Sequence, residues 1–108
     1  MALDYAVEHL RGALTTLAST DGSPTDRLQR AWIDNIQMLW MTMCLPEQLN
    51  PRFKELWERY TAPSEDRHAT TLRDLSDGEL GAAIDEVIAL ALEVVAADAR
   101  GESPPAKR

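Results

Sequence analysis

Cysteine is almost absent from this sequence. Cys44 is the only one, so no disulfide bond can form within the chain. The longest apolar run, residues 38–45, is interrupted by Thr42 and is far shorter than the roughly 20 residues of a membrane-spanning helix. Asp4 and Glu8 stand where a secretory signal would be basic and then apolar. These absences favour a cytoplasmic protein without a membrane segment.

Glycine and basic residues are also scarce. Five glycines are scattered singly, and no glycine-rich loop that could cradle a phosphate occurs. The chain has eleven lysine and arginine residues and eighteen acidic residues, which gives a net charge of -7. The basic residues are interleaved with acidic ones, so they form no stripe for a phosphate backbone. We therefore expect no cofactor and no direct binding of nucleic acid.

The remaining composition is that of one globular domain. The chain has 108 residues, of which 44% are hydrophobic and 27% charged, near the values of ordinary folded domains. We expect a helical domain over residues 1–100. Residues 101–108 carry two prolines and no large apolar side chain, which predicts a disordered C-terminal tail.

Apolar periodicity and helix-start signals predict an all-α bundle of about four helices, three long and one short. The first helix is expected over residues 2–18. Ser23-Pro24 predicts the start of a second helix that continues to about Leu45, where Pro46 ends it. Asn50-Pro51 predicts a short third helix over residues 50–60, and residues 62–74 form a connection with at most one helical turn, starting at Ser64.

The last helix is the most clearly marked. Ser76 and Glu79 have the spacing of a capping box, and Leu75 and Leu80 flank it as a hydrophobic staple. The following stripe is wide, with Ile88 and Val95 expected to thicken one edge of its buried arc. The core is expected where the middle of this helix meets the first two helices. Its predicted members are Leu10, Leu14, Trp32, Ile36, Leu39, Ile84 and Val87.

Few residues have the pattern of a chemical site. Glu65 and His68 have the i,i+3 spacing of a di-iron helix, but that site needs a second copy of the motif, which the sequence lacks. His9 is expected on the outer face of the first helix. Cys44, flanked by apolar residues, is interpreted as a small core residue. The sequence therefore predicts neither a catalytic nor a metal site, and we do not expect an enzyme.

Two surfaces are candidates for binding a partner. The later part of the second helix is apolar around its whole circumference, which indicates either a central helix or one that meets a second chain. This excess of apolar surface predicts a homodimer. The candidate self-association residues are Met38, Met41, Leu45, Leu90 and Leu92.

The second candidate surface is acidic. No basic residue occurs between Asp74 and Asp98, and three glutamates spaced by seven are expected along one solvent-facing line. This face either keeps the protein soluble or offers a phosphate-like surface to a basic partner. Its candidate residues are Glu79, Asp85, Glu86 and Glu93.

The preferred function is a small interaction or regulatory protein that contacts a protein partner, with a homodimer expected. The alternative is an acidic inhibitor that mimics nucleic acid and blocks a nucleic-acid-handling enzyme, as some phage antidefence proteins do. A small enzyme with an unrecognised site is a third possibility.

Overall fold

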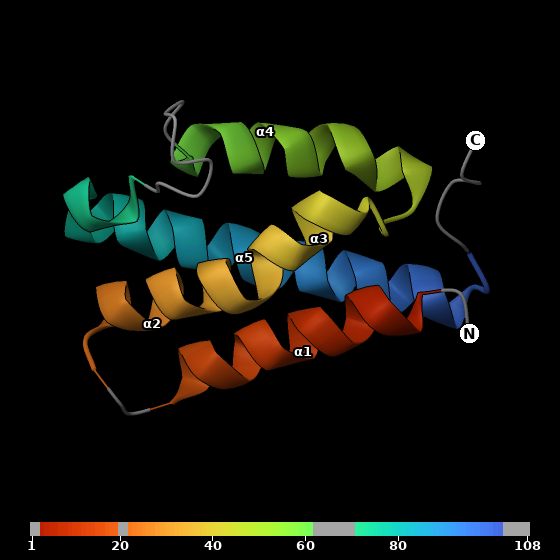
Figure 1. Ribbon diagram of the computed structural model, residues 1–108, viewed down its shortest axis with the longest axis horizontal. Helices are drawn as coiled ribbons and strands as arrows, with labels where there is room; N and C mark the ends of the chain where they lie inside the picture. Colours follow the sequence, from red (N-terminus) through yellow and green to blue (C-terminus); the bar gives the residue numbers. More distant parts are fainter. Residues whose placement is uncertain (1–2, 20–21, 62–70, 103–108) are drawn as a thin grey trace.

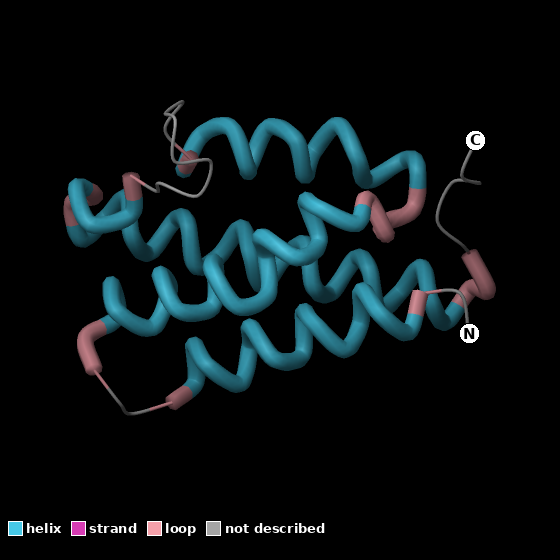
Figure 2. Tube along the Cα trace, in the orientation of Figure 1, coloured by secondary structure: helices cyan, strands magenta, loops and turns pink. Residues whose placement is uncertain are grey.

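The computed structural model describes residues 3–19, 22–61 and 71–102, and every regular element in these ranges is helical (Figures 1 and 2). The array is flattened, with extents of 37 × 32 × 20 Å. Within these ranges no helix has both the length and the apolar character needed to cross a membrane. The main helices are α1 (Asp4–Ala18), α2 (Pro24–Ala31), α3 (Gln37–Thr42), α4 (Asn50–Tyr60) and α5 (Asp77–Ala99).

The predicted all-α fold is confirmed, and the strongest start signals act as expected. The Ser23 hydroxyl accepts a hydrogen bond from the Asp26 backbone N–H, and the Asp26 carboxylate accepts one from the Ser23 N–H, which forms a complete capping box at α2. Ser76 and Glu79 form the same box at α5. Asn50 instead is the first residue of α4 rather than its cap, because a 3₁₀ turn over Glu47–Leu49 leads straight into that helix.

The predicted second helix is interrupted in the middle and ends early. A π-helical turn, Trp32–Ile36, joins α2 to α3, so the two form one continuous rod (Figure 1). The rod ends at Met43 rather than Leu45, because Met43 adopts the left-handed conformation (φ 50°) and its N–H donates to the Leu39 carbonyl. A π-turn adds one residue per turn, and apolar periodicity does not reveal it.

The π-turn packs against α1. A Cβ atom on Gly12 would lie 2.7 Å from Oδ1 of Asn35, so a larger residue at this position would require the Asn35 side chain to move. His9 faces the same residue, with 3.3 Å between its Nδ1 and Asn35 Oδ1, and its ring lies against Tyr5. The prediction that His9 occupies the outer face is therefore wrong, since this half-buried ring faces the neighbouring helix.

Aromatic rings attach α4 to the rod. Trp57 is stacked between Trp32 and Trp40, with ring centroids 5.7 and 5.1 Å away and interplanar angles of 13° and 7°. Phe53 meets Trp40 and Tyr60 meets Trp32 in edge-to-face contacts at 6.0 and 5.8 Å. Such ring pairs add stability beyond the apolar area they bury.

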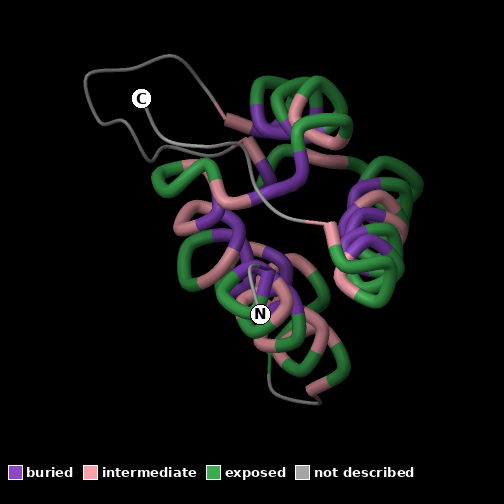
Figure 3. The backbone as a smooth tube through the Cα atoms, turned by 90° about the vertical axis from the view of Figure 1, so that its right-hand side faces the viewer, coloured by how far each residue is buried: buried purple, intermediate pink, exposed green. Residues whose placement is uncertain are grey.

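The core forms where the sequence predicts it. Leu10, Trp32, Ile36, Leu39 and Val87 are buried in one cluster, with the predicted Leu14 and Ile84 packed on it as half-buried residues. Buried residues face the inside of the helix array in Figure 3. Leu75, one residue of the predicted staple, packs on this cluster, and Leu80, the other, belongs to it.

The chain stays attached to the helices for three residues beyond the end of α5 at Ala99. Gly101 adopts φ 78°, and the Glu102 N–H donates to the Ala97 carbonyl, which caps the last turn. Glu102 also accepts a hydrogen bond from Gln48, so residues 101–102 belong to the folded domain. The rest of the predicted tail, 103–108, and the predicted turn at Ser64 lie outside the described residues.

Candidate functional site

The outer face of α5 carries a stripe of exposed aliphatic side chains. Ile88, Leu92 and Val95 are 36%, 64% and 49% exposed, and their i, i+4, i+7 spacing places them along one line of the helix. Ile84 continues this line as a half-buried residue. We call Ile88, Leu92 and Val95 the α5 stripe. A contiguous exposed apolar surface of this kind is typical of a contact site.

The structure divides the predicted self-association residues. Leu92 lies in the α5 stripe, Met41 is 61% exposed on α3, and Met38 is half-buried. The assignment of Leu45 and Leu90 to a surface is wrong, because both are buried in the core. The early end of α3 lets the chain turn and bury Leu45, whereas Leu90 lies on the side of α5 that faces α4.

Two members of the stripe were assigned to the wrong environment. Ile88 and Val95 were expected at the edge of the buried arc, but no neighbouring helix covers that edge, and both are exposed. The repeating apolar pattern shows how wide the arc is. It does not show how much of the arc the other helices cover.

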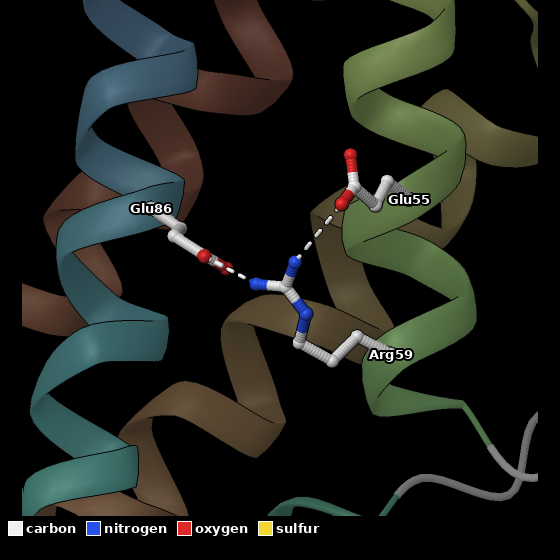
Figure 4. Close-up of polar contacts among 3 residues, drawn as sticks. All are labelled: Glu55, Arg59 and Glu86. Atoms are coloured by element: carbon white, nitrogen blue, oxygen red, sulfur yellow. Dashed lines mark hydrogen bonds and ion pairs between the residues drawn. The ribbon is translucent and has the colours of Figure 1, made fainter.

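The opposite side of α5 is paired to α4 by a ladder of charges. Arg52 and Arg59 are seven residues apart on α4, and Glu86 and Glu93 are seven residues apart on α5. The helices run antiparallel, so Arg52 bonds to Glu93 and Arg59 bonds to Glu86. Figure 4 shows Arg59 also reaching Glu55 on its own helix, with 3.4 Å between Nη2 and Oε1.

This ladder crosses a small groove between the two helices. The groove has a volume of about 160 Å³, and Leu56 and Leu90 line it together with the charged residues. Each arginine in it already has a glutamate partner, so the groove offers no free positive charge to an anionic ligand. We interpret the ladder as a structural contact that aligns α4 with α5.

The predicted acidic face is therefore not a uniform solvent-facing line. Glu86 and Glu93 pair with α4, and Glu79 caps the start of α5. Hydrogen bonds from the Ser76 backbone N–H and hydroxyl lower the pKa of Glu79 below its ordinary value. Of the four residues, Asp85 alone is exposed without a hydrogen bond or ion pair in the part of the chain that the structure describes.

A second apolar concavity lies at the turn between α3 and α4. It measures about 460 Å³ and includes the exposed side chain of Met43, the left-handed residue that ends α3. A non-glycine residue in this conformation stores backbone strain. The lining residues are Trp40, Met43, Glu47, Asn50, Pro51, Phe53 and Lys54.

The remaining candidates for chemistry form no site. Cys44 is half-buried, and burial raises the pKa of its thiol, which keeps it in the unreactive neutral form at pH 7. Glu65 and His68 lie outside the described residues. Across residues 3–19, 22–61 and 71–102, no group of three His, Cys, Asp or Glu side chains could hold a metal ion.

Comparison with known proteins gives no relative. No protein-family model, curated protein or solved structure matches this chain. Among the surfaces described above, the α5 stripe has the largest set of exposed, large apolar side chains on one helix.

Proposed function

We propose that this protein is a small interaction or regulatory protein of the cytoplasm that acts through protein–protein contacts. The observation that carries the proposal is the α5 stripe, where Leu92 leaves 64% of its surface exposed between two further aliphatic side chains. Burial of such side chains against a partner is favourable at roughly 25 cal/mol per Å² of apolar surface. The core covers the buried side of α5, and Glu86 and Glu93 pair with α4, so the stripe holds the large apolar side chains of this helix that remain exposed.

The alternative, an acidic mimic of nucleic acid, has less support. Two of its four carboxylates are neutralised by Arg52 and Arg59, and Glu79 is engaged in a helix cap. A mimic requires carboxylates that are free to meet a basic groove, because charge complementarity across the interface provides its attraction.

Affinity capture with a matched pair of variants tests the proposed function. Leu92→Glu places a charge in the α5 stripe, and Met41→Glu makes the same change at a comparably exposed site on α3. We expect the unmodified protein and Met41→Glu to retain the same specific partner, and Leu92→Glu to lose it. Retention of every partner by Leu92→Glu would contradict the proposal.

A further inference from the structure

We propose that the α5 stripe binds a second copy of this chain, with the two α5 helices antiparallel about a twofold axis at Leu92. This inference rests on the function proposed above, because it names the partner of the same surface. A twofold interface uses one patch on both subunits, so the patch must complement itself. The sequence and exposure of α5 meet this requirement in both shape and charge.

The shape complementarity follows from the spacing of large and small side chains. In the antiparallel pair, residues equally far before and after Leu92 face each other. Ile88 then faces Ala96 of the partner subunit, and Val95 faces Ala89 of the partner subunit. Ala96 is exposed and Ala89 is half-buried, so each large side chain meets a small one that allows the helices to approach closely. Leu92 meets its own copy on the axis.

The charges select the antiparallel orientation. Asp85 lies seven residues before Leu92 and Arg100 lies eight residues after it, so each carboxylate is placed beside the guanidinium of the other chain. Arg100 is exposed and is the only basic residue between Asp74 and Glu102. Its Nε bonds to Glu102 at 2.6 Å, which leaves its other N–H groups for Asp85 of the partner subunit. A parallel pair would instead place the two Asp85 carboxylates together.

The small size of the α5 stripe limits the expected affinity of the dimer. A single pair of helices that buries three large aliphatic side chains from each chain lies at the low end of specific interfaces, below about 1,200 Å² in total. We therefore expect a reversible dimer whose population rises with protein concentration.

Sedimentation equilibrium of the full chain over a range of concentrations tests the proposed dimer. The mass should rise from 12.0 kDa towards twice that value. Leu92→Glu, which brings two carboxylates together on the axis, should weaken the dimer by at least about tenfold, since like charges that face each other across an interface are strongly unfavourable. Leu92→Ala should weaken it less, and Met41→Glu should leave it unchanged. Circular dichroism checks that each variant remains folded.

A charge exchange tests the orientation. Asp85→Arg and Arg100→Asp should each weaken the dimer, and the double variant should restore it. A double variant as weak as the single ones would overturn the antiparallel arrangement. A mass of 12.0 kDa at every concentration would overturn the dimer itself. In that case, loss of a different protein partner by Leu92→Glu would still support the proposed function, so the two failures are distinguishable.

Discussion

Leu39 is a central residue of the hydrophobic core. It is fully buried where the rod of α2 and α3 crosses the core, and the last turn of α3 keeps it there. We expect Leu39→Ala to lower the free energy of unfolding by about 2 to 5 kcal/mol, because the change leaves a cavity. Urea denaturation measures this loss. The exposed neighbour Met41 is the control, since Met41→Ala should change stability by no more than about 0.5 kcal/mol. An unchanged midpoint for Leu39→Ala would contradict the assigned core.

The contribution of Glu79 to stability, made at the start of α5, depends on pH. Its pKa is lowered in the folded state by hydrogen bonds from Ser76, so its ionised form stabilises the fold. That contribution is present above the ordinary glutamate pKa of about 4.3 and disappears as the pH falls through the lower folded-state value. We expect Glu79→Gln to be less stable than the unmodified protein at pH 7.

Urea midpoints of the unmodified protein and of Glu79→Gln, measured from pH 7 down to pH 3, test this expectation. The difference between the two midpoints should shrink below about pH 4. Asp34→Asn is the control, because Asp34 makes no side-chain hydrogen bond or ion pair with the described residues and should show no such gap. A gap for Glu79→Gln that stays constant over this range would show that the ionised cap is not its cause.

At the scale of helices, the alignment of α4 with α5 depends on residues far apart in the sequence. The pair Arg52–Glu93 is a simple probe of this alignment, because neither side chain has a second ion-pair partner within the described ranges. We expect Arg52→Glu and Glu93→Arg each to destabilise the protein, and the double exchange to recover most of the loss. The coupling energy should be about 0.2 to 1 kcal/mol, since both side chains are solvent-exposed.

Thermal denaturation of the four proteins in this double-mutant cycle gives the coupling energy directly. Raising the salt concentration to 1 M should reduce it, because screening shortens the range of exposed charges to about 3 Å. A zero coupling energy at low salt would show that the apolar and aromatic contacts alone align the two helices.

Helix starts were the elements that the sequence predicted best. Ser23 and Ser76 each bond to a residue three positions later, so all the atoms of each cap lie in one short segment. The π-turn and the early end at Met43 could not be predicted in this way. The π-turn packs against α1 beside Gly12, and Met43 leads into the turn before α4, so both features involve segments outside the local sequence pattern.

For the whole molecule, stability depends on which of the negative charges are paired. Glu79, Glu86 and Glu93 look like a solvent-facing line in the sequence, and their replacement by glutamine would then change stability little. In the structure, one of them caps a helix and two pair with arginines. We therefore expect the triple glutamine variant to melt at a lower temperature than the unmodified protein.

A second triple variant removes the same number of charges from unpaired positions. Glu8→Gln, Asp34→Asn and Glu47→Gln alter exposed residues that make no side-chain hydrogen bond or ion pair with the part of the chain described. Scanning calorimetry at equal salt should show the smaller change for this control. Equal melting temperatures for the two triple variants would mean that net charge, rather than these contacts, determines the effect.

The sequence by itself determined the all-α class, the places where α2 and α5 begin, and the central members of the core. These features depend on interactions within a few residues or on the apolar period of one helix. Only the tertiary structure decided that Leu45 and Leu90 are buried and that Ile88, Leu92 and Val95 are exposed. The physical reason is that the apolar arc of α5 is wider than the surface its neighbours cover. The sequence of one helix determines how wide its apolar arc is, whereas the part of that arc that becomes buried depends on how all the helices pack.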